Sequence, residues 1–169
     1  MCLKEEILDL VNENDQIIGQ ASRNEVSIDG VKNYRVINAF IKNKEGRLWI
    51  PRRTAKKRIF PLALDMSVGG HVERGESYLQ GFERELFEEV NIKLEDVEYT
   101  EMLYLNPYKC DISSFMKVYE IYLDYTPDYN KSDFIESYWL MPEEVIERIT
   151  EGDSAKSDLI KVIKLLYKK

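Results

Sequence analysis

Three carboxylates within one short segment are the residues of this chain whose types and spacing best suit chemistry. Glu85, Glu88 and Glu89 stand at positions i, i+3 and i+4, which places them on one side of an α-helix. Like charges this close repel each other, and they crowd the helix C-terminus, where the dipole favours cations. A bound hard cation would remove the conflict, because Mg²⁺ prefers oxygen ligands. Taken alone, the spacing indicates either a metal site or a solvated acidic face.

The segment that carries these carboxylates has the signals of a complete helix. Ser77 followed by Gln80 is typical of a capping box at the N-terminus. An apolar stripe at helical spacing follows, made of Leu79, Phe82, Leu86 and Val90. The carboxylates fall beside this stripe, at a rim between core and solvent. Just upstream, the glycines in Ser67–His71 permit a sharp turn and a close approach of backbone to a ligand.

The order of residues across this loop and helix resembles a known motif. From Gly70 to Ile92 the chain has a glycine, five residues, Glu76, seven residues, and then Arg-Glu-Leu-Phe-Glu-Glu-Val-Asn-Ile. This order is similar to the Nudix box, the pattern of a large family of enzymes that mostly hydrolyse nucleoside diphosphates linked to another group. The fixed position that differs is the last glycine, here Asn91. Asparagine is the usual second choice for the left-handed residue that closes a helix, so the departure is mild.

The resemblance implies a fold and a reaction. The fold would be α/β, a Nudix-type α/β/α sandwich with a central mixed sheet. The reaction would be hydrolysis of a diphosphate bond in a nucleoside diphosphate derivative or related small phosphorylated metabolite, dependent on Mg²⁺, with Mn²⁺ as an alternative. Metal ions in such a site neutralise charge on phosphate oxygens and lower the pKa of bound water, while the protein supplies position and electrostatics.

The resemblance also assigns roles within the motif. Glu85 and Glu89 would be the strongest metal ligands, followed by Glu88 and by the carbonyl of Gly70. Arg84 would orient a box carboxylate, and it joins the three glutamates as an expected catalytic residue. Four further residues would shape the loop and support the ligands: Gly69, His71, Glu73 and Glu76.

The sequence leaves open which residue is the catalytic general base and which residues would stack on a nucleobase. In many members of the Nudix family the general base is a glutamate of the box. In others it is a glutamate from a later loop, for which Glu136 is the candidate here. His71, the only histidine, either hydrogen-bonds a loop carbonyl or contacts substrate or a second metal. Several aromatic residues could stack on a nucleobase of the substrate or simply pack within strands: Tyr104, Tyr108, Phe115, Tyr119 and Tyr122.

Basic residues are concentrated just before the box. The run consists of Arg52, Arg53, Lys56, Lys57 and Arg58. A charge run in a loop is most often only solvated. Next to a site built for phosphates, however, Arg52, Arg53 and Lys57 are expected to bind the anionic substrate, with Arg35 as a weaker candidate.

Two alternative functions come with the resemblance, which covers most of the chain from about Leu8 to Ile149. One follows from residues that look like the branch of Nudix proteins related to isopentenyl diphosphate isomerase: Val11–Asp15, Ile18-Gly19, Arg35, Arg52-Arg53 and Lys57 before Pro61. That isomerase needs a cysteine where this chain has Gly69, and glycine cannot transfer a proton. Its acidic partner would fall near Ser113 or Ser114, although Glu120 lies in the same strand. The other alternative is a non-catalytic nucleotide-sensing module. Degenerate domains of that kind usually lose box carboxylates, and this chain keeps them.

Composition favours a small enzyme acting on a small molecule. At 169 residues, with 44% hydrophobic residues and no long apolar run, the chain is expected to form one domain over 1–169, with 1–30 as an N-terminal hairpin extension. Cys2 and Cys110 lack metal-ligand spacing, and the charged N-terminus does not resemble a signal peptide, so we expect a cytoplasmic protein. A net charge of −7 disfavours nucleic acid polymers as partners. We expect a small-molecule diphosphate and no membrane partner; a homodimer stays open.

Strand and helix patterns alternate along the chain. Two hairpins are expected, Ile7–Val11 with Gln16–Ala21 and Tyr34–Ile41 with Arg47–Pro51. The later expected elements are strands at Val97–Leu105, Phe115–Tyr125 and Phe134–Leu140 and helices at Pro142–Thr150 and Asp158–Tyr167. A mixed sheet covered by helices would position the box.

Overall fold

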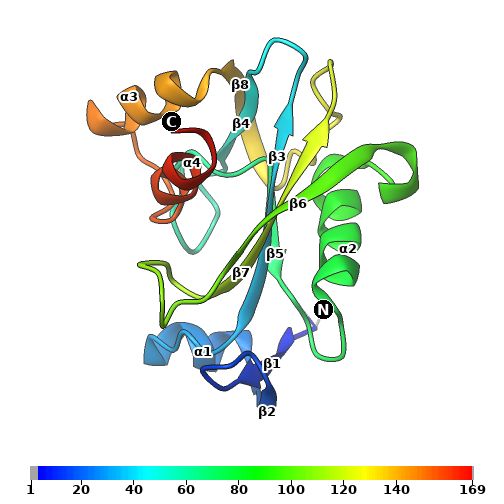
Figure 1. Cartoon of the computed structure of the whole chain (residues 1–169), viewed down its shortest axis with the longest axis vertical. Helices are drawn as coiled ribbons and strands as arrows, with labels where there is room; N and C mark the ends of the chain where they lie inside the picture. Colours follow the sequence, from blue (N-terminus) through cyan, green and yellow to red (C-terminus); the bar gives the residue numbers. More distant parts are fainter. Residues whose placement is uncertain (1–3, 169) are drawn as a thin grey trace.

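A six-stranded mixed sheet lies at the centre of the computed structural model, which describes residues 4–168 (Figure 1). Its strands are β3 (Arg35–Lys42), β4 (Leu48–Arg53), β5 (Val68–His71), β6 (Glu98–Leu105), β7 (Phe115–Tyr122) and β8 (Phe134–Leu140). The order is β6-β7-β3-β4-β8, and β5 pairs with residues 36–39 of β3. The β3 and β7 strands are parallel, and the other pairs are antiparallel.

Helices cover both faces of this sheet, which gives the predicted α/β/α sandwich. Figure 1 shows α2 (Tyr78–Val90) on one side and α3 (Pro142–Thr150) and α4 (Leu159–Tyr167) on the other. A short 3₁₀ helix, η1 (Leu94–Asp96), follows α2. Alternate residues of β3 pack on opposite sides, so that Ile37 joins the core under α2 and Phe40 the core under α4.

An N-terminal unit lies outside the central sheet. Strands β1 (Ile7–Val11) and β2 (Ile17–Ser22) form the predicted hairpin, and the helix α1 (Arg23–Asp29) follows it. Helix α1 was not predicted, although Ser22 and Glu25 form a capping box at its start. Asp15, in the hairpin turn, accepts hydrogen bonds from Arg35 Nε at 2.6 Å and the Tyr78 hydroxyl at 2.8 Å. The hairpin is therefore tied to β3 and to α2.

The remaining differences from the expected elements are local. The glycine segment expected as a turn is the short strand β5, and β7 ends at Tyr122. Cys110 is a free thiol, whereas Cys2 lies outside the described residues. Within residues 4–168, no helix is long and apolar enough to cross a membrane.

Glu120 on β7 is a buried carboxylate with a structural role. Its Oε1 lies 2.8 Å from Lys42 Nζ, and the hydroxyl of Tyr167 on α4 donates a hydrogen bond to its Oε2. Burial would raise the pKa of Glu120, but hydrogen bonds from Lys42, Tyr167 and Tyr122 outweigh burial and lower it. The carboxylate thus remains charged and joins β3, β7 and the C-terminal helix.

Replacing Glu120 with Gln should reduce the free energy of unfolding at pH 7 by about 1–3 kcal/mol, because a buried charge-assisted contact is lost. The lowered pKa means that this stabilisation is complete above the unfolded-state pKa of roughly 4.3 and disappears as pH falls through the folded-state value. Urea unfolding of both proteins at pH 7 and at about pH 3 tests this. A difference that stays constant between the two pH values would contradict the charge pairing.

Candidate active site

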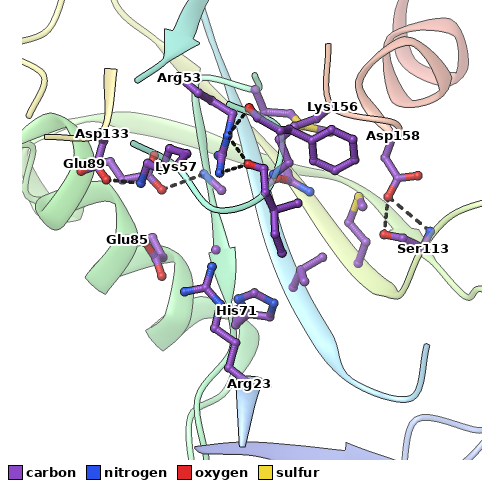
Figure 2. Close-up of a pocket in the computed structure, with 18 of the residues that line it drawn as sticks. Arg23, Arg53, Lys57, His71, Glu85, Glu89, Ser113, Asp133, Lys156 and Asp158 are labelled. Carbon is purple, nitrogen blue, oxygen red and sulfur yellow. Dashed lines mark hydrogen bonds and ion pairs between the residues drawn. The ribbon is translucent and has the colours of Figure 1, made fainter. Parts of the chain in front are cut away.

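A cavity of about 470 Å³ lies where α2, β3, β5 and the segment before α4 meet (Figure 2). Its charged lining residues are Glu6, Arg23, Arg53, Lys57, Glu85, Glu88, Glu89, Asp133, Lys156 and Asp158. Figure 2 shows Glu85 and Glu89 on α2, across the cavity from Ser113 and Asp158. The cavity therefore combines acidic and basic side chains from segments far apart in the sequence.

Helix α2 has the ends that the sequence predicts. Ser77 and Gln80 form the capping box, and Asn91 closes the helix in the left-handed conformation with φ 56°. Phe82 and Leu86 are buried in the core, whereas Leu79, expected in the apolar stripe, is exposed. The packing of the stripe fixes the rotation of α2 and directs the carboxylates along its edge toward β5.

Arg84 joins α2 to the loop before it. Its Nε lies 2.7 Å from Glu76 Oε1, its Nη1 lies 2.8 Å from Glu85 Oε1, and its Nη2 donates to the His71 carbonyl at 2.9 Å. Glu76 also accepts a hydrogen bond from the backbone N–H of Glu73. Arg84, Glu73 and Glu76 do not line the cavity among the described residues, so their contacts position the groups that do.

The two glycines of β5 allow the carboxylates to approach the strand. A side chain at Gly70 would overlap the Glu85 carboxyl group, and one at Gly69 would meet the Asn38 side chain on β3. The N–H of Gly69 donates to Glu89 Oε1 at 3.4 Å. Both glycines line the cavity, so glycine is required here for close approach.

Glu85 and Glu89 are held in an environment that opposes their charge. Burial raises the pKa of Glu85 to about 7, although Arg84 opposes the shift. Burial and then the charge of Glu85 raise the pKa of Glu89 well above its usual range. The raised pKa values mean that ionising either carboxylate at neutral pH lowers the stability of the metal-free folded protein.

The donor set nevertheless fits a hard cation. Glu85, Glu89 and the adjacent Gly70 offer only oxygen ligands, and a divalent cation would relieve the buried charge. Glu88 also lines the cavity, but its side chain is 55% exposed and contacts Arg84 at 3.3 Å. In the described part of the chain, no three acidic, histidine or cysteine side chains converge on one metal-binding point. Glu85 and Glu89 are thus the best-placed pair.

Cationic side chains reach the cavity from the last residue of β4, from the loop after it and from the segment before α4. Arg53 Nη1 lies 2.7 Å from Asp65 Oδ2, and Lys57 Nζ lies 2.6 Å from Asp133 Oδ1. Lys156, which the sequence did not single out, lies 3.4 Å from Asp65. Arg53 and Lys57 therefore lie at positions where an anion bound in the cavity could contact them.

Two of the predicted substrate-binding residues and the loop candidate for the general base do not line the cavity either. Arg35 pairs with Asp15 in the N-terminal hairpin. Arg52 lies opposite Glu136 on β8 and pairs with Glu136 and Asp153 at 2.9 Å each, whereas Arg53, beyond an irregularity in the strand pairing, lines the cavity. Glu136, the loop candidate for the general base, is consequently occupied away from the carboxylates of α2.

His71 lines the cavity beside Tyr34, with ring centroids 5.4 Å apart. Burial, helped by the charge of Arg23, lowers the pKa of His71 to about 3, so the ring is neutral at pH 7. Across the cavity, Asp158 accepts hydrogen bonds from the N–H and hydroxyl groups of Ser113. His71, Ser113 and Asp158 thus add polar groups to the lining of the cavity.

The aromatic residues expected from the sequence are not those that line the cavity. Tyr104 donates to Asp15, and Tyr119 stacks on Phe82 in the core at 4.3 Å. The aromatic side chains at the cavity are Tyr34, Phe60, His71 and Phe134. The sequence singled out His71, whereas the positions of Tyr34, Phe60 and Phe134 follow from loop and sheet packing, which no local sequence signal encodes.

The loop between β4 and β5 has an unusual backbone. Phe60 and Leu62 have φ angles of 50° and 60°, in the left-handed region that bulky residues avoid. Each such residue costs about 1–3 kcal/mol and persists only where the surrounding structure enforces it. Arg53 donates to the carbonyls of Ile59 and Phe60, and Arg52 donates to that of Leu62 at 3.0 Å. The adjacent arginines thus hold this loop in shape.

Comparison with known proteins gives consistent results. A family model described as NUDIX domain matches residues 32–162. An uncharacterized Nudix hydrolase of Nostoc sp. (strain PCC 7120) is 57% identical over 162 residues, which cover 96% of each chain. A Nudix hydrolase of Deinococcus radiodurans is 42% identical and covers 98% of this chain and 96% of its own.

Solved structures agree with these matches. The crystal structure of DR0079 from Deinococcus radiodurans superposes with a TM-score of 0.92 at 42% identity, covering 96% of this chain and 100% of that chain. The MutT protein from Methanosarcina mazei shares the fold at a TM-score of 0.58 and 20% identity, covering 80% and 96% of the two chains.

Replacing Glu89 with Gln should stabilise the metal-free protein at pH 8 by about 1–3 kcal/mol, because a buried uncompensated charge is removed. The raised pKa means that the folded state holds its proton longer, so wild-type stability falls as pH rises above roughly 4.3. The gain in the variant should therefore grow from pH 4 to pH 8, measured by urea unfolding with EDTA present. Glu83→Gln, an exposed change on the same helix, is the control; equal effects of the two changes would refute the electrostatic assignment.

Proposed function

This chain belongs to the Nudix hydrolase family, and from that premise we propose that it hydrolyses a diphosphate bond in a nucleoside diphosphate derivative or a related small phosphorylated metabolite. The observation that carries the proposal is the cavity itself. It places the buried carboxylates Glu85 and Glu89 opposite charges that suit phosphate, those of Arg53 and Lys57. Mg²⁺ is the proposed metal, with Mn²⁺ as an alternative.

Glu85 and Glu89 would hold the metal, with Glu88 and the Gly70 carbonyl as further oxygen ligands. When bound there, the metal supplies charge neutralisation at the phosphate oxygens and a lower pKa for water. The chain contributes the position of these ligands. Arg84 fixes Glu85 through the 2.8 Å ion pair, and Gly70 leaves the space that the Glu85 carboxyl group occupies.

The cationic residues are proposed to bind the phosphate oxygens. Lys57 pairs with Asp133, which also lines the cavity, and Arg53 pairs with the buried Asp65, so an anionic substrate would exchange or share these partners. We place the general base among the box glutamates. Glu136 is a poorer candidate, since its carboxylate lies 2.9 Å from Arg52 and does not line the cavity in the described residues.

Neither alternative accounts for the groups at this cavity. Isomerisation requires a proton donor and acceptor on opposite sides of an allylic carbon chain, but Gly69 has no side chain. Ser113 bonds Asp158, and Glu120 is covered by Tyr167 and takes no part in lining the cavity. A purely sensing module would not need the buried carboxylate pair. Incubation with Mg²⁺ and a panel of diphosphates separates the three, with product phosphates and isopentenyl isomerisation monitored separately; robust isomerisation would sink the hydrolase proposal.

Replacing Glu89 with Gln should reduce kcat at least ~10²-fold, which corresponds to about 2.7 kcal/mol in the barrier. Glu85→Gln should behave alike, and Glu88→Gln similarly or less severely, because Glu88 is more exposed. Steady-state kinetics on the best substrate of the panel, with a Mg²⁺ titration, measures the effect. Glu83→Gln should keep wild-type activity. Normal turnover in the Glu85 and Glu89 variants would show that these carboxylates are structural.

Replacing Lys57 with Met should raise KM about tenfold or more with a smaller change in kcat, because a charged contact to the substrate phosphates is lost. Lys56→Met makes the same charge change one residue earlier, at an exposed position that does not line the cavity, and should leave KM near wild type. Kinetics at two salt concentrations measures both variants. Equal KM values in the two variants would reduce the basic run to a solvated charge patch.

A further inference from the structure

Phe60 combines two unfavourable features at the edge of the cavity. Its φ is 50° although it precedes Pro61, and a residue before proline normally adopts an extended conformation. Its side chain is also 39% exposed, beside an Ile59 side chain that is 40% exposed. Core packing explains neither feature, because a buried ring would gain the hydrophobic stabilisation that an exposed ring lacks.

The surrounding structure enforces this position. Arg53 Nε donates to the carbonyls of Ile59 at 3.2 Å and Phe60 at 3.1 Å, and Arg53 itself is fixed by the buried Asp65. Backbone strain that is enforced in this way is a feature of ligand-binding and active sites. The Phe60 ring is therefore presented to the cavity on a rigid loop.

The same loop carries the proposed phosphate-binding cation. Lys57 and Leu62 both donate backbone hydrogen bonds to the carbonyl of Thr54, so the turn that presents Lys57 also fixes the backbone around Phe60. Both Lys57 and Phe60 line the cavity. A ligand with an anionic group and an adjacent flat apolar group would meet both residues at once.

We propose that Phe60 is a stacking platform for a planar aromatic heterocycle in the substrate, so that nucleoside diphosphate compounds are preferred over diphosphates without an aromatic group. The proposal rests on the proposed function and names the class of its substrate. Aromatic side chains stack on any nucleobase through the π-face, which gives affinity without reading the edge of the base. Covering the ring would also remove the exposed apolar surface at the cavity edge.

Binding of ADP, UDP and inorganic pyrophosphate, measured by calorimetry in EDTA, tests the proposal without turnover. Phe60→Ala should weaken ADP and UDP binding about tenfold and leave pyrophosphate binding unchanged, and Phe60→Trp should keep nucleotide affinity. Leu62→Ala is the matched control, because Leu62 lies in the same loop with φ 60° and 46% exposure but does not line the cavity. It should bind all three ligands like the wild type.

Two results would overturn the proposal. Equal weakening of nucleotide and pyrophosphate binding in Phe60→Ala would mean that Phe60 only shapes the loop. Nucleotide binding by the wild type that is no tighter than pyrophosphate binding would mean that no aromatic platform exists. Neither result decides the hydrolase proposal, which depends on turnover in the diphosphate panel and on the Glu89 variant.

Discussion

The burial of two like charges on neighbouring turns of α2 is the constraint on which the rest of the site depends. Glu85 and Glu89 lie against β5, where burial raises the pKa of both. Of these two carboxylates, only that of Glu85 has an arginine, Arg84, at ion-pair distance among the described residues. The fold must offset this cost, and it does so through the apolar packing of Phe82 and Leu86 under the same helix.

That packing and the site chemistry cannot be separated, because one helix provides both. The apolar side of α2 sets the rotation of the helix, and the rotation determines where the carboxylates emerge. The emerging Glu85 carboxyl group then requires a strand without a side chain, which Gly70 supplies. Arg84 closes the arrangement by bonding both the helix carboxylate and the His71 carbonyl. A change in any one of these elements would displace the others.

Features encoded by neighbouring residues could be predicted from the sequence, and features created by tertiary packing could not. The caps of α2 at Ser77 and Asn91 were readable because their signals are local. Helix α1 had the same kind of signal at Ser22, and reading it would have found the helix. By contrast, Lys156 reaches the cavity because its backbone N–H donates a hydrogen bond to the carbonyl of Leu64. No sequence pattern predicts this long-range contact.

The basic run shows most clearly that the fold gives neighbouring cations different surroundings. Arg53 directs most of its hydrogen bonds to carbonyls of the strained loop and also neutralises the buried Asp65, whereas Arg52 donates to one loop carbonyl, that of Leu62, and otherwise pairs mainly with Glu136 and Asp153. Their charge thus shapes the site, whereas Lys57 holds a more exposed position within it. The loop and α2 each place energetically unfavourable groups at the cavity. The loop holds a strained and exposed aromatic ring there, and α2 holds buried carboxylates. Groups of this kind gain most when a complementary ligand binds, so the same features that lower stability favour binding.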